Sequence, residues 1–276
     1  MHSHVNNNTL DHRSTGTGDP VLFIHGAVVA DMLRPIAEAP ALSEYHRITY
    51  HRRGYGGSSR SGGPTSLVDQ VDDAAGLLDV LRLGAVHVVG HSLGAVIAMM
   101  LAARHPDRVR SLALIEPPAP LDSVAGAAFM GAIRPLLERY LAGDREGAVH
   151  AFLGMIGKPG WAELMERVAP GSVAQAVRDA DTAFGTELAA AAGWTESLGA
   201  ELAVGVRCPV LSVLGTESGP LFSAGRTALH RWFPECREAD IVGASHEAPL
   251  EQPDAITSVL GAFLSRAAAT QPVARS

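Results

Sequence analysis

Residues 86–106, VHVVGHSLGAVIAMMLAARHP, decide the fold because they predict a buried strand that turns directly into a buried helix. The β-branched run 86–89 favours a strand, and the small apolar residues of 93–104 favour a helix that ends before Pro106. At the junction, Ser92 has one glycine two residues before it and another two residues after it. A sharp strand–turn–helix strains the residue at its apex, often to φ > 0, and leaves no room for side chains at the flanking positions. The pattern therefore predicts a serine hydroxyl that is presented for chemistry.

Short apolar runs alternate with longer helical patterns on both sides of this stretch. The strand candidates are residues 9–14, 21–25, 47–51, 86–89, 111–115, 210–214 and 237–242. The helix candidates between them are residues 31–38, 66–81, 93–104, 224–232 and 253–268. Alternation of this kind predicts a doubly wound α/β fold with a mostly parallel sheet.

The alternation is interrupted once, over residues 117–207, where no convincing strand pattern occurs. Helical spacing is found instead in residues 127–141, 144–155, 161–168 and 173–188. A structureless loop of that length is improbable in a compact domain. We therefore expect a helical lid insertion at 117–207, between a first core part at 1–116 and a second at 208–276.

Composition excludes several classes of protein. The chain has 276 residues, 47% of them hydrophobic, a net charge of −7 and no block of Lys and Arg. Nucleic acids and anionic membranes need a basic surface, so neither is an expected partner. Two cysteines without paired Cys/His spacing predict neither a disulfide scaffold nor a zinc site.

The first twenty residues lack the basic lead and apolar core of a signal peptide. The uncharged run 84–103 is long enough to imitate a membrane span, but the strand-to-helix turn in its middle favours a buried strand and helix. We expect a cytoplasmic protein that acts on a small molecule, and the sequence leaves homodimer formation open.

A serine hydroxyl needs a base to take its proton, and the base needs a carboxylate to orient it. Among twelve histidines, His246 is distinguished by its place in IVGASHEAPLEQP, between the last predicted strand and the last predicted helix. That loop reaches the same edge of the sheet as the serine turn. His91 adjoins Ser92, but sequence neighbours point apart at a tight turn, so we expect it to pack or to line a pocket.

An oxyanion hole requires two N–H groups that face the developing negative charge. The amide of Leu93, directly after the serine, is one candidate. The amide of Ala27 is the other, because it follows the apolar run 21–25 and the turn at Gly26.

Four stretches together resemble the α/β-hydrolase family: VLFIHGA, YHRRGYGGSS, VVGHSLGAVIA and GASHEAPLEQP, in the family's order. The resemblance extends from about Thr9 to Leu264. It implies Ser92 as nucleophile, His246 as base, and the amides of Ala27 and Leu93 as the oxyanion hole. It implies no metal and no organic cofactor.

The carboxylate departs from the family's usual pattern. Most members carry an aspartate in the turn after a strand like PVLSVLG, but the turn here reads GTESGP, with Ser218 at that position and Glu217 one residue away. The family's second solution is an acid that ends the strand after the nucleophile helix, and LALIEPP supplies Glu116 there. A lone carboxylate at the end of an apolar strand is costly to bury without a partner. We favour Glu116, and Glu217 is the alternative.

The expected activity is hydrolysis of an ester, thioester or lactone of a small, largely apolar substrate through an acyl-enzyme. Epoxide hydrolases and haloalkane dehalogenases share the fold but need a carboxylate nucleophile, which position 92 does not provide. The alternatives are a cofactor-free C–C bond hydrolase or lyase, an acyltransferase on the same triad, and a non-catalytic ligand-binding member. We expect some of the large apolar residues of the lid to line an acyl pocket: Phe129, Met130, Phe152, Met155, Trp161 and Phe184.

Overall fold

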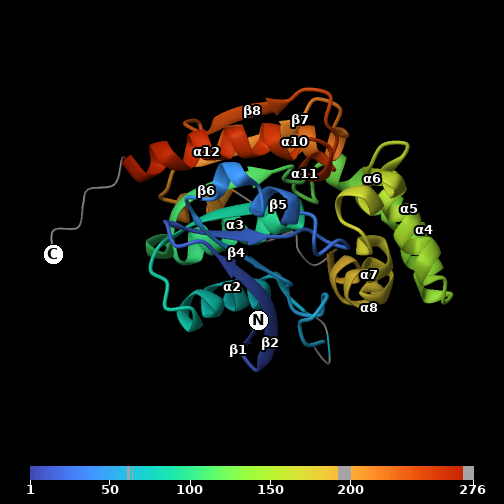
Figure 1. Cartoon of the computed structure of the whole chain (residues 1–276). Helices are drawn as coiled ribbons and strands as arrows, with labels where there is room; N and C mark the ends of the chain where they lie inside the picture. The colour runs from blue at the N-terminus through green and yellow to red at the C-terminus, as the bar shows by residue number, and fades with distance from the viewer. Residues whose placement is uncertain (61–62, 64, 192–199, 270–276) are drawn as a thin grey trace.

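A computed structural model of the chain describes residues 1–60, 63, 65–191 and 200–269. These residues form a central sheet of eight strands in the order β1-β2-β4-β3-β5-β6-β7-β8 (Figure 1). The strands are β1 His2–Val5, β2 Asn8–Thr15, β3 Pro20–Ile24, β4 His46–Tyr50, β5 Val86–His91, β6 Val109–Ile115, β7 Val210–Gly215 and β8 Arg237–Ile241. The pairs β1·β2 and β2·β4 are antiparallel, and all other neighbours are parallel. The predicted doubly wound, mostly parallel sheet is confirmed.

Strand β1 is the one strand that the sequence analysis missed. It pairs with β2 as a hairpin through Asn6 and Asn7, which have φ of 46° and 64°. Two central residues with positive φ match the right-handed twist of a hairpin, and asparagine tolerates that conformation. The strand itself, HSHV, has only one buried residue, so no apolar run marked it.

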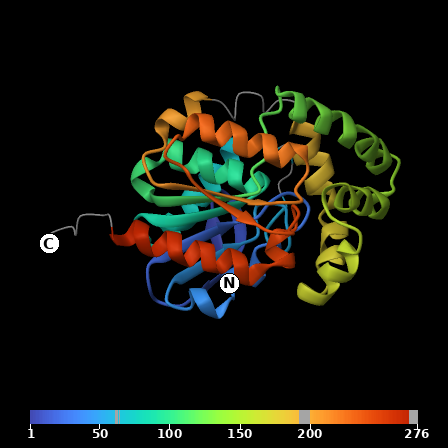
Figure 2. The same ribbon diagram turned by 90° about the horizontal axis from the view of Figure 1, so that it is seen from above.

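Two layers of helices cover the sheet (Figure 2). Helices α2, α3 and α10 pack on one face, and α1 and α12 pack on the other. The short helix α11 lies between β8 and α12 in the chain. Their bounds are α1 Arg34–Ala37, α2 Leu67–Val80, α3 Leu93–Arg104, α10 Pro220–Trp232, α11 Ala248–Glu251 and α12 Pro253–Ala269, with the 3-10 turns η1 Pro40–Leu42 and η2 Pro106–Arg108.

Residues 117–191 and 200–207 contain helices and turns and no strand, as the sequence predicts. The helices are α4 Val124–Leu141, α5 Arg145–Ile156, α6 Trp161–Val168, α7 Ser172–Arg178, α8 Ala180–Thr182, the π-helix η3 Ala183–Leu188, and α9 Ala200–Gly205. The single helix expected over 173–188 is divided into α7, α8 and η3. Helices α4 to α8 gather at one end of the molecule, beside the sheet (Figure 1). We call residues 117–191, which contain α4 to α8 and η3, the helical insertion.

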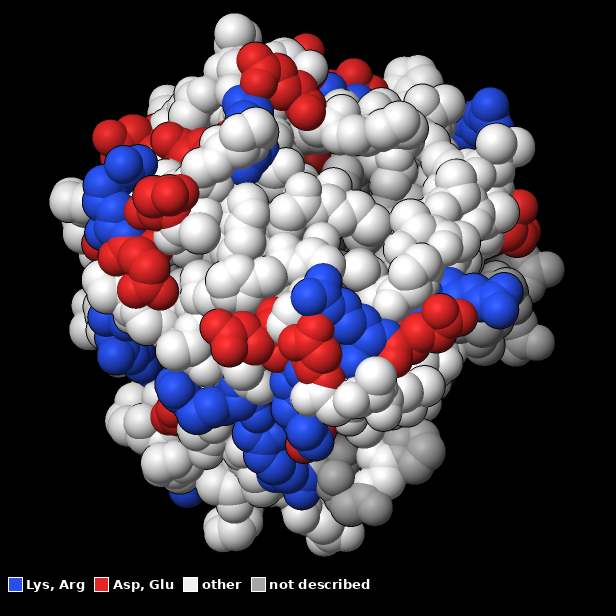
Figure 3. Space-filling model, turned by 90° about the vertical axis from the view of Figure 1, so that its right-hand side faces the viewer, with Lys and Arg blue, Asp and Glu red and all other residues white. Residues whose placement is uncertain are grey.

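On the face formed by the helical insertion, positive and negative side chains lie next to one another around a broad area without charged groups (Figure 3). Many of these charges are paired, for example Arg139 with Asp144 and Arg145 with Asp181. This face therefore carries no extended field of one sign. Among the helices that the structure describes, none combines the length and apolar character needed to cross a membrane.

Candidate active site

Ser92 occupies a strained turn between β5 and α3. Its φ is 54° and its ψ is −124°, a conformation that L-residues rarely adopt. A Cβ added at Gly90 would lie 2.4 Å from the carbonyl oxygen of Gly94, and one added at Gly94 would lie 2.1 Å from that of Ile24. The expected positive φ and the expected steric need for both glycines are confirmed. The turn holds Ser92 at the carboxyl end of β5, at the start of a helix.

We expect Gly94→Ala to destabilise the fold. The new methyl group would meet backbone oxygens of Ile24 and His25, which cannot move without shifting β3. Overpacking of this kind costs about 1–3 kcal/mol in the free energy of unfolding, measurable by urea denaturation. The matched control is Gly131→Ala on exposed α4, where a Cβ meets nothing within 4 Å and a helix gains up to about 1 kcal/mol. Equal stability of the two variants would contradict the packing argument.

The imidazole of His246 is buried between two other rings. Phe222 stacks on it with ring centroids 3.8 Å apart, and His91 stacks on it at 4.7 Å. The Nε2 of His91 is 3.0 Å from the backbone oxygen of His246, so His91 also holds the loop. Burial lowers the pKa of His246 to about 3. The ring is therefore uncharged at neutral pH and can accept a proton.

Glu116 lies at the end of β6 with its side chain fully buried and its own φ at 54°. Its Oε1 accepts hydrogen bonds from the N–H of Gly215 at 2.5 Å and from the hydroxyl of Ser218 at 2.8 Å. Its Oε2 lies 3.6 Å from Nδ1 of His246. Burial raises the pKa of Glu116 to about 7, and the two hydrogen bonds act in the opposite direction. The two donors on Oε1 leave the other oxygen directed at the imidazole.

Glu217, the alternative acid, is placed differently. Its side chain is 57% exposed and forms an ion pair with Lys158 at 2.5 Å. The structure thus places Glu116 beside His246 and Glu217 at the surface.

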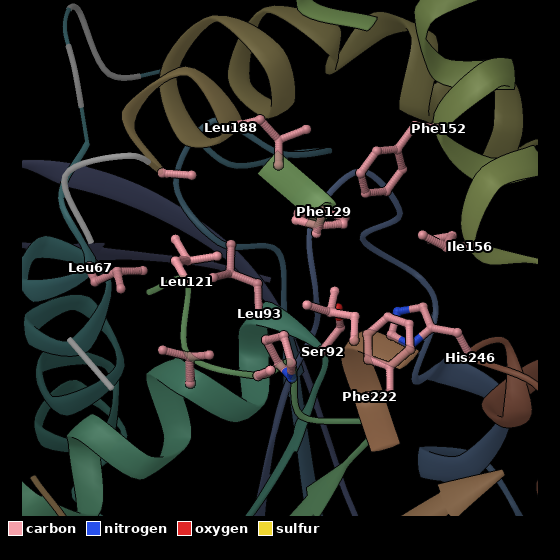
Figure 4. A pocket seen from close by; sticks show the side chains of 16 residues that line it. Leu67, Ser92, Leu93, Leu121, Phe129, Phe152, Ile156, Leu188, Phe222 and His246 are labelled. Carbon is pink, nitrogen blue, oxygen red and sulfur yellow. The ribbon is translucent and has the colours of Figure 1, made fainter. Parts of the chain in front are cut away.

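Ser92 and His246 line one cavity, part of which is open to solvent (Figure 4). Their side chains are the only polar ones among the described lining residues; the others are Ala27, Leu67, Leu93, Val96, Pro118, Ala119, Leu121, Phe129, Phe152, Ile156, Leu188, Ala191, Leu221 and Phe222. The cavity can hold an apolar group against a serine and a neutral histidine.

The two expected oxyanion residues, Ala27 and Leu93, both line this cavity. Leu93 is the first residue of α3, so its N–H belongs to the end of the helix that lacks intrahelical partners. Within the described part of the chain, no hydrogen bond uses the N–H of Ala27. Both amides are therefore placed where they could serve a ligand.

Sequence reasoning placed only part of the lining correctly. Of the six large apolar residues expected to be candidates, Phe129 and Phe152 reach the cavity, whereas Phe184, Met130 and Trp161 do not line it and belong to the hydrophobic cluster between the helical insertion and the core. Met155 is 38% exposed. Phe222 was missed, although its position two residues after the start of α10, just beyond the GTESGP turn, could have indicated a place at the same sheet edge.

The comparisons with known proteins identify the family and the fold. A sequence model of the alpha/beta hydrolase fold matches residues 19–253. The chain is 28% identical over 263 residues to a protein of Azorhizobium caulinodans named as a carbamate hydrolase, with 95% of this chain and 97% of that protein covered. It is 38% identical over 103 residues to the 2-hydroxymuconate semialdehyde hydrolase of Pseudomonas putida, which covers 36% of this chain and 37% of that one. The structure of a thermophilic esterase from Thermogutta terrifontis superposes with a TM-score of 0.76 at 25% identity, over 94% of each chain.

Proposed function

The chain belongs to the alpha/beta hydrolase fold family, and on that premise we propose that it hydrolyses an ester, thioester or lactone of a small apolar substrate through an acyl-enzyme on Ser92. One observation carries the proposal: a serine at a strained strand-to-helix turn and a buried histidine line the same apolar cavity. Nucleophile and base at one cavity are what acyl transfer needs.

In the proposed reaction each residue has one role. Ser92 attacks the carbonyl carbon while Nε2 of His246 takes its proton. Glu116, whose Oε2 lies 3.6 Å from Nδ1 of His246, orients the ring and stabilises the imidazolium that forms. The amides of Ala27 and Leu93 stabilise the tetrahedral oxyanion. His246 then gives its proton to the leaving group and activates the water that hydrolyses the acyl-enzyme.

The lining supports a neutral substrate with an apolar acyl group. No Lys or Arg side chain is found among the cavity's described lining residues. An anionic substrate would lose its hydration there without gaining a counter-charge. We further propose that residues 117–207 act as a lid between the core parts 1–116 and 208–276, since Phe129, Phe152 and Ile156 of this segment line the cavity that also contains Ser92.

A substrate panel tests the proposal. It contains p-nitrophenyl esters of increasing acyl length, neutral lactones, and β-diketones as C–C substrates, each with an anionic counterpart. We expect the neutral esters or lactones to be turned over with the highest kcat/KM. Turnover confined to the β-diketones would establish C–C bond hydrolysis instead, and tight binding of the compounds without any turnover would establish a ligand-binding protein.

We expect Ser218→Ala to change the pH profile. Glu116 must be ionised to stabilise the imidazolium, and loss of the Ser218 donor removes a contact that keeps its pKa from rising further above about 7. The acid limb of kcat/KM therefore moves to higher pH. A shift of one pH unit would lower kcat/KM about tenfold at pH 6 and leave it nearly unchanged at pH 9. Ser223→Ala, at an exposed position of α10, is the control, and an unchanged acid limb in Ser218→Ala would show that Ser218 does not act on Glu116.

A further inference from the structure

The motif HRRGYGG contains an arginine that the proposed reaction does not use. Arg52 is completely buried and forms a two-point ion pair with Glu187 of the π-helix η3, Nη1 with Oε1 and Nη2 with Oε2. The hydroxyl of Tyr55 donates to Glu187 Oε2 at 2.6 Å, and the amide of Gln70 donates to Oε1 at 3.0 Å. We call these four residues the Arg52 cluster. It joins the helical insertion to the core in the interior of the protein.

The Arg52 cluster also holds the backbone just before Ala27. Arg52 donates from Nε to the backbone oxygen of His25 at 3.1 Å and from Nη2 to that of Gly26 at 2.8 Å. The side chain of His25 donates from Nδ1 to the same Gly26 oxygen at 2.8 Å, while its Nε2 accepts from the N–H of Arg52 at 3.0 Å. Since a carbonyl can only accept and a backbone N–H can only donate, these contacts assign the Nδ1–H tautomer to His25. The Gly26 carbonyl is thus held by two donors.

The backbone just after Ala27 is held by the same cluster. The N–H of Val28 donates to the hydroxyl of Tyr55 at 3.3 Å. Val28 has φ of 68°, which is a strained conformation for a β-branched residue, and it is fully buried. Such strain persists only where the surroundings hold it. Arg52 therefore holds the peptide group before Ala27, and Tyr55, whose hydroxyl donates to Glu187, holds the peptide group after it.

A peptide unit is planar, so the C=O of Gly26 and the N–H of Ala27 point in opposite directions from one rigid plane. Fixing the carbonyl toward Arg52 directs the Ala27 N–H away from Arg52. We propose that Arg52 and Glu187 are positioning residues that set the Ala27 N–H as an oxyanion donor, so that formation of the hole depends on how the helical insertion is seated on the core. This inference rests on the proposed function, because that function gives the Ala27 N–H its role as an oxyanion donor.

The neighbouring Arg53 provides a matched control. It forms a buried two-point ion pair with Asp73 of α2, with N–O distances of 2.6 Å at both contacts. Within the described part of the chain, no hydrogen bond joins Arg53 or Asp73 to residues 25–28. Of the two arginines, only Arg52 holds the loop before Ala27.

The test compares Arg52→Met/Glu187→Met with Arg53→Met/Asp73→Met. Replacing a whole buried ion pair by apolar residues is often neutral for stability, whereas removing one partner leaves an uncompensated charge. The first measurement is the ratio of kcat/KM for p-nitrophenyl acetate to that for its thiono analogue, whose sulfur is a weak acceptor of N–H groups. The second is the deuterium exchange rate of the amides of residues 25–29.

We expect the ester-to-thionoester ratio to fall at least tenfold in Arg52→Met/Glu187→Met, because oxyanion donors act on the oxygen ester. Exchange at residues 25–29 rises in the same variant, and the Arg53 control changes neither quantity. An unchanged ratio together with unchanged exchange would overturn the inference. An equal change in the control would overturn it too, since any buried ion pair would then have the same effect.

Glu187→Gln tests the contribution of the helical insertion separately. It keeps the size of the side chain and removes the charge that holds Arg52, and we expect the ratio to fall in the same direction. A wild-type ratio in Glu187→Gln would overturn the dependence on the insertion. If the wild type turned over neither ester, the proposed function would fail, and the exchange measurement alone would decide whether Arg52 and Glu187 position the loop.

Discussion

Ser92→Ala is expected to lower kcat for the best ester of the panel by about 10⁵-fold or more. Removal of the nucleophile from a serine triad has an effect of that order, because the remaining groups cannot act without it. The cavity keeps its apolar lining in this variant. Substrate affinity should therefore change far less than kcat, and steady-state kinetics on purified protein measures both.

Misfolding would give the same loss of activity, so the melting temperature is compared in parallel. Alanine keeps the Cβ that Ser92 already has at φ of 54°, and we expect the melting temperature to stay within a few degrees of the wild type. Ser223→Ala, on the surface of α10, controls for loss of a hydroxyl elsewhere. Retention of more than one tenth of wild-type kcat in Ser92→Ala would exclude Ser92 as the nucleophile.

Glu116→Gln is expected to lower kcat by about 10³–10⁴-fold, and Glu217→Gln by less than about threefold. Glutamine preserves the shape of Glu116 but supplies no negative charge to stabilise the imidazolium of His246, and changes of this kind at a triad acid cost about 10⁴-fold. Glu217 is exposed and paired with Lys158, so its charge is screened from the cavity. Parallel measurement of kcat at pH 8 decides between the two acids.

The stability of Glu116→Gln separates chemistry from folding. Since burial raises the pKa of Glu116 to about 7 in the folded protein, its ionisation opposes folding as the pH rises through that value. Above pH 7 the glutamine variant should therefore be at least as stable as the wild type, although it is much less active. A larger loss of kcat in Glu217→Gln would instead move the triad acid to Glu217.

Local patterns in the sequence predict most of this fold. The apolar runs of β3, β5, β6 and β7 are buried along nearly their whole length and therefore stand out in the sequence, and α3 has the bounds that were predicted. Strand β1 was missed because it lies at the edge of the sheet and buries almost nothing. The division of residues 173–188 into α7, α8 and η3 could not be predicted, because it depends on the tertiary contacts of Asp179 and Glu187 with residues 52–60.

The candidate site shows the same limit. Ser92 and its two glycines form a local pattern, and the cost of burying Glu116 alone indicates that this carboxylate has a partner. Phe222 on His246 and Glu187 on Arg52 are contacts between residues far apart in the chain, and no spacing rule reveals them. Sequence therefore indicates the reacting groups better than it indicates the residues that orient them.

The most direct test of the central claim is the location of a covalent adduct. A fluorophosphonate that mimics an acyl ester is incubated with the wild type, and the modified residue is identified by peptide mass spectrometry. The account predicts one adduct per chain, on Ser92, formed at a rate that falls in His246→Ala and is absent in Ser92→Ala. An adduct on another residue, or ester turnover that persists while Ser92 stays unmodified, would contradict it.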